Sequence, residues 1–197
     1  MYGPFPAARP ARLRRRTVTV GTELWRIDAL DPTEWDWVGF PSARFRFDPA
    51  SGAFRVRYAG TSIAGAAREK YLDTGKLIPA DHATRHLVHL AATRPLKVVD
   101  LRSQVNLDAI DVDDRINTSH EDVIWNACHR FADAVKGWWD EIDGIMYRSR
   151  TTPETSINVA FFSLDGFAVE GGRVLRTCID ELDDLVLHDQ FTVGFQY

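Results

Sequence analysis

Cysteine is scarce in this chain of 197 residues, which has only Cys128 and Cys178. Two cysteines without a CxxC spacing exclude a disulfide-stapled secreted domain and a cysteine-ligated zinc site. Long apolar runs are lacking too, since no stretch approaches the roughly 18 to 20 residues of a membrane helix. Residues 17–20, which follow the first arginines, are too few for the apolar core of a signal peptide. These absences predict a cytoplasmic protein without a membrane partner.

An excess of basic charge is also missing, because 24 Lys and Arg residues face 28 Asp and Glu residues and give a formal net charge of −4. Apolar residues, in contrast, make up 45% of the chain and aromatic residues 11%. This much apolar surface excludes disorder over the whole chain. With about 100–200 residues in a typical domain, the length favours one domain with its own core.

The first 16 residues differ in composition from the rest. Three prolines and five arginines stand among alanines there. We therefore expect residues 1–16 to form a flexible basic arm and residues 17–197 to form the folded domain. The arm could neutralise a few phosphates of a nucleic acid, but the body is acidic and has no DNA-reading helix, so direct nucleic-acid binding is not expected.

Short strands outnumber helices in the secondary structure that the sequence predicts. Alternating and β-branched patterns predict strands at residues 17–27, 54–59, 96–101, 144–147 and 158–162. Helices are predicted from Thr61 or Ser62, either of which can serve as N-cap, to about residue 73, and from about residue 119 to 138. The fold class is therefore α+β, a single compact domain with a small central mixed β-sheet and flanking helices.

Two other segments have weaker patterns. Residues 31–53 combine Pro and Gly with aromatic residues, which predicts an ordered but irregular cap. Gly171 and Gly172 predict a hairpin, followed by a closing amphipathic tail.

Four polar residues fall at predicted strand ends or in the first turns of a helix: Arg26, Arg46, Tyr58 and Glu69. Glu69 lies about two helical turns into its helix, so its carboxylate can face back over the strand that carries Tyr58. Arginine binds phosphate oxygens, tyrosine stacks on rings, and a carboxylate accepts a ribose hydroxyl or stabilises positive charge at an anomeric carbon. The set suits a phosphorylated nucleotide; a solvated helix face around Glu69 and a half-buried Tyr58 explain the same residues structurally.

A second group follows the strand at residues 144–147. Ser149 stands between Arg148 and Arg150, and Asn158 lies on the next predicted strand. A hydroxyl and two cations at the carboxyl end of a strand are typical of a ligand site. The structural alternative is a core strand that leaves into a charged loop.

Taken in order along residues 17–165, these pieces resemble the RES domain family. The resemblance is carried by five short stretches, namely Trp25-Arg26, Arg46-Phe47-Asp48-Pro49, Tyr58-Ala59, the helix with Glu69, and Asp143-Gly144-Ile145 with Tyr147 and Ser149-Arg150. The family is named for its Arg, Glu and Ser and comprises toxins of bacterial toxin–antitoxin pairs, usually encoded beside an Xre-like antitoxin.

The resemblance implies a fold related to the ADP-ribosyltransferase toxins and cleavage of NAD+ between nicotinamide and ribose. The acceptor of ADP-ribose would be inorganic phosphate, as in an NAD+ phosphorylase, with a protein side chain or water as alternatives. NAD+ and phosphate would be substrates and no metal would take part. The implied partner is a helix-turn-helix antitoxin of the Xre type, in a homo- or hetero-oligomer.

The resemblance also implies a role for each residue. Glu69 would be the catalytic carboxylate, assisted by Arg26 and Tyr58, and Tyr58 would pack against the nicotinamide. Arg26 and Arg46 would hold the phosphates or the nicotinamide-side ribose, Ser149 would support the pocket, and Asn158 would join the NAD-binding residues. Because the surrounding motif departs from the family pattern, Arg44 competes with Arg46 for its role.

Two further groups allow other chemistry. Cys128 and His129 are adjacent on a predicted helix and therefore point about 100° apart, which disfavours a nucleophile pair and favours a buried Cys128. The spacing of His82, His86 and His89 would place them on one helix face, as in a metal site, but only Asp81 could join them. A binding module without enzymatic activity is a remaining alternative.

Overall fold

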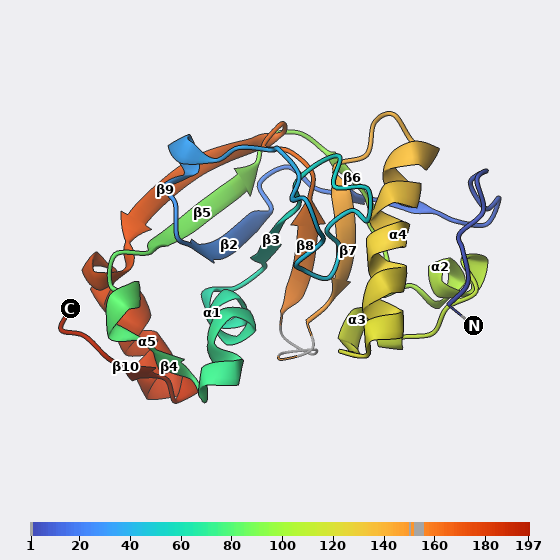
Figure 1. The fold of residues 1–197 in the computed structure, drawn as a ribbon. Coiled ribbons are helices and arrows are strands. Elements are labelled where there is room, and N and C mark those ends of the chain that lie inside the picture. The colour runs from blue at the N-terminus through green and yellow to red at the C-terminus, as the bar shows by residue number, and fades with distance from the viewer. Residues whose placement is uncertain (1, 150, 152–155) are drawn as a thin grey trace.

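The structure, a computed structural model, describes residues 2–149, 151 and 156–197 (Figure 1). Its main feature is an eight-stranded sheet in the order β1-β6-β7-β8-β3-β2-β5-β9. The strands are β1 (Arg15–Val18), β2 (Glu23–Asp28), β3 (Arg57–Gly60), β5 (His86–Ala92), β6 (Leu96–Asp100), β7 (Gly144–Arg148), β8 (Ile157–Phe161) and β9 (Phe167–Val174). A separate parallel pair joins β4 (Leu77–Ile78) to β10 (Thr192–Val193).

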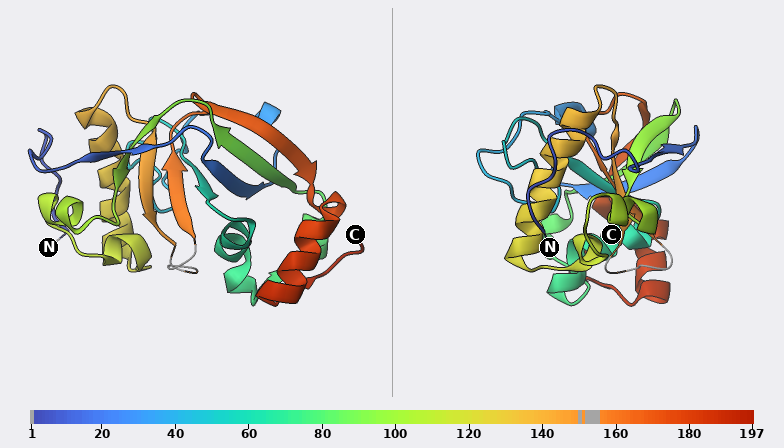
Figure 2. Two further views of the ribbon diagram at one scale, coloured as in Figure 1. Left: turned by 180° about the vertical axis from the view of Figure 1, so that it is seen from behind. Right: turned by 90° about the vertical axis from the view of Figure 1, so that its right-hand side faces the viewer.

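The sheet is mixed, because β6 and β7 pair in parallel and the other neighbouring strands pair antiparallel. Strand β8 joins the two halves of the sheet. Its residue Asn158 pairs with Gly60 of β3 on one side and with Tyr147 of β7 on the other. Figure 2 shows how strongly the sheet curls between its two ends.

The helices gather at the two ends of this sheet. They are α1 (Ile63–Tyr71), α2 (Gln104–Ala109), α3 (Arg115–Thr118), α4 (Asp122–Trp138) and α5 (Ile179–Asp189), with short 3₁₀ turns at Pro32–Glu34, Leu72–Thr74, Ala80–His82 and Leu175–Thr177. Figure 1 shows α1 and α5 at the end of β2 and β5, and α2, α3 and α4 at the end of β6 and β7. The α+β prediction of one domain with flanking helices is confirmed.

Local sequence explains the two helices that were predicted. Helix α1 begins after Ser62, whose Oγ accepts a hydrogen bond from the Gly65 amide at 3.0 Å. Helix α4 has an apolar stripe at helical spacing that is fully buried against β6 and β7: Ile124, Ala127, Cys128, Phe131, Ala132 and Val135. Both helices therefore have a fixed orientation on the sheet.

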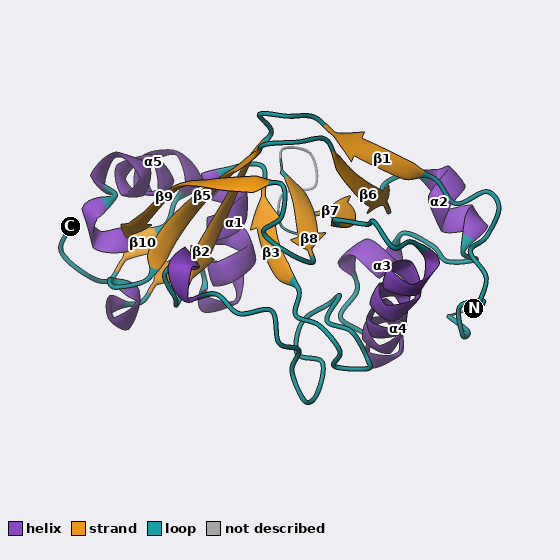
Figure 3. Cartoon of the chain, turned by 90° about the horizontal axis from the view of Figure 1, so that it is seen from above, coloured by secondary structure: helices purple, strands orange, loops and turns teal. Residues whose placement is uncertain are grey.

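The β2–β3 connection is the irregular cap that the sequence predicted. In the view from above it extends from β2 toward α4 before returning to β3 (Figure 3). Hydrogen bonds from the Ala50 amide to His129 O and from Ser51 to Asp133 attach it to that helix. The cap thus brings its arginines next to the α3–α4 end of the molecule.

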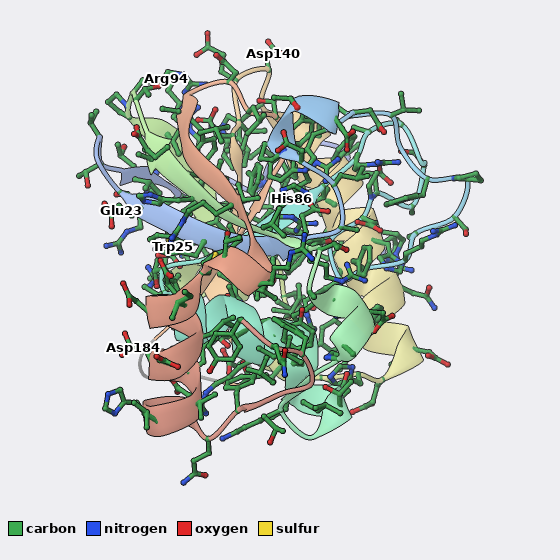
Figure 4. All side chains as sticks on the ribbon, turned by 90° about the vertical axis from the view of Figure 1, so that its left-hand side faces the viewer. Glu23, Trp25, His86, Arg94, Asp140 and Asp184 are labelled. Atoms are coloured by element: carbon green, nitrogen blue, oxygen red, sulfur yellow. The ribbon has the colours of Figure 1, made fainter. Side chains whose placement is uncertain are left out.

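Three predicted elements need correction. The predicted strand 17–27 is two strands, since the chain turns at Gly21 with a φ of 77°. Gly171 and Gly172 lie inside β9, where a bulge opposite His89 and Leu90 interrupts the ladder, rather than in a hairpin. The closing tail is confirmed as amphipathic, with α5 burying Leu182 and Leu185 and projecting Asp184 outward (Figure 4).

Several of residues 2–16, which the sequence predicts as a flexible arm, pack against the folded domain. Leu13 is 3% exposed within the core that α4 covers, and the Phe5 ring lies 5.1 Å from the Phe131 ring. Ordered structure begins before residue 17, because Arg15 and Arg16 already pair with β6. Prolines and arginines dominate the composition of this segment, but the few apolar residues among them pack against the core. Residue 1 lies outside the described residues.

Candidate functional site

A cleft of about 820 Å³ opens where β2, β3, α1, the β2–β3 cap and the α3–α4 region meet. Figure 1 shows α1 on one side of β8 and β7 and the α3–α4 pair on the other. The cleft is lined by the sequence-predicted residues Arg26, Arg46, Tyr58, Glu69 and Asn158. Residues that are far apart in sequence therefore converge on one site.

Glu69 is half-buried on α1, one turn beyond the tightly packed Gly65. Its Oε1 accepts a hydrogen bond from the Ser149 hydroxyl at 2.7 Å and another from the Thr151 hydroxyl at 3.2 Å. Ser149 is fully buried behind the carboxylate and does not line the cleft. Ser149 therefore positions Glu69, and the carboxylate is fixed in the cleft wall rather than solvated on a helix face.

Arg26 of β2 is held by two contacts, one to β2 itself and one to β3. Its Nε donates to Asp28 Oδ2 at 2.6 Å, and its Nη1 donates to the Tyr58 carbonyl at 2.8 Å. Asp28 also accepts from Arg57 Nη1 at 3.1 Å, so one carboxylate orients two guanidiniums. Arg57 is buried and lies over the Trp35 ring, and burial together with repulsion from Arg26 lowers the pKa of Arg57 to about 10. Arg57 therefore remains cationic at neutral pH.

Arg46 and Arg44 occupy different environments in the same cleft. Arg46 is 7% exposed, donates from Nη1 to the Ile116 carbonyl at 3.0 Å and lies 5.7 Å from the Trp125 ring. Among the described residues it has no carboxylate partner. Arg44 is exposed over the Phe40 ring. The buried cation that faces the cleft without a counter-charge is Arg46, which favours it over Arg44 as an anion ligand.

The hydroxyl of Tyr58 is used within the protein. It donates to Asp48 Oδ1 at 3.2 Å and accepts from the Phe47 amide at 2.9 Å. Burial and the neighbouring Asp48 charge raise the pKa of Tyr58 well above its ordinary value. Tyr58 is therefore a neutral phenol that anchors the cap and offers its ring to the cleft.

Asn158 contributes a side-chain amide to the cleft. It is 3% exposed on β8 and lines the cleft. Tyr147 lies beside it across the β7–β8 ladder, and a hydrogen bond from the Asn158 side chain lowers the Tyr147 pKa against the larger effect of burial. Asn158 therefore places an amide next to a buried phenol at the cleft wall.

The cleft is cationic although the chain is acidic. Its described lining has seven basic residues, which are Arg26, Arg44, Arg46, Arg55, Arg57, Lys70 and Arg85, against the three acidic residues Asp28, Glu69 and Asp73. A concave site with this balance concentrates anionic ligands.

The cations expected beside Ser149 do not both join this site. Arg148 is exposed and its guanidinium reaches Asp114 at 3.4 Å, because it alternates with the inward-facing Tyr147 along β7. The prediction that Arg148 belongs to the cleft is therefore corrected. Arg150 lies outside the described residues.

The other candidate groups are dispersed. Cys128 is fully buried, donates to Ile116 O at 3.5 Å, and burial raises its pKa to about 11, as expected of a core thiol. His86 and His89 lie on strand β5, not on a helix with His82. No cluster suited to a metal ion occurs within the described ranges. None of the helices described there is long and apolar enough to cross a membrane.

Sequence reasoning missed several residues of the site. Asp28 follows Arg26 by two positions, so strand alternation was a usable signal for their shared face. Thr151 follows Ser149 by two positions, but its sequence position alone assigned it no role. No sequence signal pointed to Trp125 or Arg85. Trp125 is one of several aromatic residues on α4, and Arg85 precedes β5, a strand that the sequence did not predict.

Comparisons with known proteins identify the family and the fold. The family model of the RES domain matches residues 23–180. Among solved structures, the fold resembles the crystal structure of the M. tuberculosis MbcT–MbcA toxin–antitoxin complex, with a TM-score of 0.53 and 15% sequence identity over 83% of this chain and 87% of that chain. No curated protein matches. Since the family model spans well over half of the sequence, this chain belongs to the RES domain family.

Proposed function

We propose that this protein is the toxin of a toxin–antitoxin pair and cleaves NAD+ between nicotinamide and ribose. The observation that carries the proposal is Glu69, a carboxylate held by two hydroxyls in the wall of a cleft whose charged lining is mostly cationic. A dinucleotide is anionic at its diphosphate and becomes cationic at the reacting sugar carbon. The cleft offers the opposite charge at both places.

Glu69 supplies the chemistry in this proposal. The C–N bond breaks with both electrons leaving on the nicotinamide ring, which is thereby neutralised, so the leaving group needs no proton. The ribose carbon passes through an oxocarbenium-like state, and a carboxylate fixed beside it stabilises the developing positive charge. Inorganic phosphate then forms a bond to that carbon, and the products are nicotinamide and ADP-ribose-1″-phosphate.

The remaining residues bind and orient the substrate. Arg26 and Arg46 would hold phosphate oxygens, and the ring of Tyr58 would pack against nicotinamide. The Asn158 amide, which lines the cleft, would donate to a carbonyl or hydroxyl of the ligand. Such positioning uses binding energy to orient the substrate at the reacting carbon.

We also propose a protein antitoxin of the helix-turn-helix type as the partner, bound so that it blocks the cleft within a hetero-oligomer. Support comes from family membership and from the solved structure with the same fold, which is a toxin–antitoxin complex. The NAD+ pool of the cytoplasm would be the target.

The test is NAD+ consumption by the purified protein, with and without phosphate, with products identified by mass. We expect ADP-ribose-1″-phosphate with phosphate present. Glu69→Gln should lower kcat by at least about 100-fold, because a neutral amide cannot stabilise the cation, at nearly unchanged Tm. Glu170→Gln, which removes an exposed carboxylate on β9, is the matched control.

The outcomes separate the alternatives. Free ADP-ribose would identify an NAD glycohydrolase, and a modified protein would identify a protein ADP-ribosyltransferase. Full activity of Glu69→Gln would contradict the assignment of the carboxylate. No turnover under any condition would favour a binding module without enzymatic activity.

A further inference from the structure

Two basic residues line the cleft on the side of β2 and β5. Lys70 follows Glu69 on α1, and Arg85 directly precedes β5. We propose that Lys70 and Arg85 together bind a phosphate group. The inference rests on the proposed function and names a subsite within that cleft.

The first support is the absence of partners in the part of the chain that the structure describes. Arg26 and Arg57 share Asp28, and Arg55 pairs with Asp36, but neither the Lys70 side chain nor the Arg85 side chain has a hydrogen bond or ion pair there. The Nε of Arg85 is buried and unsatisfied. A buried N–H donor at a cleft wall without a protein acceptor indicates an acceptor supplied by a ligand.

The second support is mutual repulsion. Loss of water around the Lys70 ammonium lowers its pKa, and the positive charges of Arg85 and Arg26 lower it further, by more than the Asp28 carboxylate raises it. These cations are thus close enough to destabilise one another. A bound dianion would offset that repulsion, which a neutral ligand could not do.

The third support is chemical complementarity. Lysine provides a compact charge with three donors, whereas arginine provides a planar fork that binds two oxygens of one phosphate. Together they suit a tetrahedral anion. The site is also next to Glu69 along α1, so an anion bound there lies in the same cleft as the reacting sugar.

The proposed reaction offers two sources of that phosphate group. One is inorganic phosphate, which must approach the ribose carbon as acceptor. The other is the diphosphate of the dinucleotide. Both present the same chemistry to Lys70 and Arg85, and a binding experiment with separate probes distinguishes them.

The experiment is calorimetric titration of the full chain with inorganic phosphate and, separately, with ADP-ribose, neither of which requires turnover. For Lys70→Gln/Arg85→Gln we expect Kd for one of these probes to rise about tenfold or more, as the loss of charge-assisted hydrogen bonds implies. A rise for inorganic phosphate alone assigns the acceptor site, and a rise for ADP-ribose assigns the diphosphate site. Arg12→Gln/Lys136→Gln removes two exposed charges outside the cleft and should change neither Kd.

Unchanged Kd values for both probes in the double variant would overturn the subsite, as would a wild-type protein that binds neither. Circular dichroism and Tm verify folding, and the charge-preserving Lys70→Arg/Arg85→Lys variant should keep Kd within about threefold of wild type. Phosphate binding without NAD+ consumption would leave the subsite standing and reject the proposed function. NAD+ consumption together with probe binding that is unchanged in the Lys70 and Arg85 variants would support the proposed function and reject the subsite.

Discussion

At the scale of single residues, Asp28 has the greatest influence on the cationic cleft. Its Oδ2 accepts from Arg26 and Arg57, and its Oδ1 accepts from the Ala29 and Leu30 amides. Burial by itself raises the pKa of Asp28, but Arg26, the Leu30 amide and Arg57 outweigh it, so the pKa lies below its ordinary value. Asp28 is therefore ionised at every pH at which the protein would work.

Asp28→Asn should lower the free energy of unfolding at pH 7 by about 3 kcal/mol, because it leaves the buried Arg57 charge without a carboxylate. A depressed folded-state pKa gives stability that is present above the unfolded pKa of about 3.9 and is lost as pH falls through the folded value. The difference between wild type and variant should therefore be constant from about pH 7 to about pH 5 and shrink below about pH 4. Urea unfolding at pH 7, 5 and 3 measures it.

Asp140→Asn is the control for this series, because Asp140 is exposed and lies at the top of Figure 4, well above Asp184 of α5. Its unfolding should follow wild type at each pH. If the difference in free energy of unfolding between wild type and Asp28→Asn stayed constant down to pH 3, the ion-pair explanation would be contradicted.

Residue identity alone predicted the centre of the site but not its surroundings. Arg26, Tyr58 and Glu69 could be named because their chemistry fits a nucleotide and their order resembles a family. Thr151 and Lys70 could not be assigned roles, since a hydroxyl or an ammonium is informative only once its neighbours are known. Arg148 was placed wrongly because strand alternation beyond Tyr147 was not applied.

At the scale of elements, the contact between α1 and Ser156, the residue directly before β8, bears on where Glu69 lies. Gly65 faces Ser156 so closely that a Cβ would come 2.0 Å from its Oγ. Glu69 is four residues further along the same face of α1, near Ser149. A glycine at this position allows the helix to approach the sheet closely enough for those hydrogen bonds.

Gly65→Ala should therefore destabilise the fold by about 1–3 kcal/mol through overpacking. It should also lower NAD+ turnover, since displacing α1 moves the Glu69 carboxylate away from Ser149. Thermal melts and steady-state kinetics measure the two effects.

Gly137→Ala provides the comparison on α4, where an added Cβ would meet nothing within 4 Å. There the substitution should be neutral or stabilising by up to about 1 kcal/mol, as helix propensity implies. If Gly65→Ala behaved like Gly137→Ala, close packing would not be what positions Glu69.

Elements with complete local signals were predicted well, and those without them were not. Helix α1 has a capping serine and α4 a long apolar stripe. Strand β5 was missed because its residues do not alternate strictly between apolar and polar, and its histidines have helical spacing. The bulge in β9 depends on its partner strand, which the β9 sequence does not contain.

At the scale of the whole molecule, the N-terminal segment is part of the core. Leu13→Ala should cost about 2–5 kcal/mol of stability, in the range of buried leucine truncations. Leu187→Ala, at a position 73% exposed on α5, should cost less than about 0.5 kcal/mol. Urea unfolding of the two variants measures the difference.

Trypsin gives an independent readout of the same point. The segment contains five arginines, which in a flexible arm would be cut rapidly. We expect their cleavage in the native protein to be slow and to accelerate in Leu13→Ala. Rapid cleavage of the wild type, together with an unchanged free energy of unfolding in Leu13→Ala, would show that the segment is a flexible arm.

The order of the strands in space has a consequence for the protein as it is being synthesised. Strand β8 joins the two halves of the sheet. Ser149, which holds the Glu69 carboxylate, follows Glu69 by 80 residues in the chain. A ribosome adds roughly 5–20 residues per second, so several seconds separate the emergence of Glu69 from that of its support. Until β8 emerges, the nascent chain has the carboxylate and the arginines but no cleft. The cleft, and with it the proposed NAD+ site, would therefore form only after most of the chain has been made.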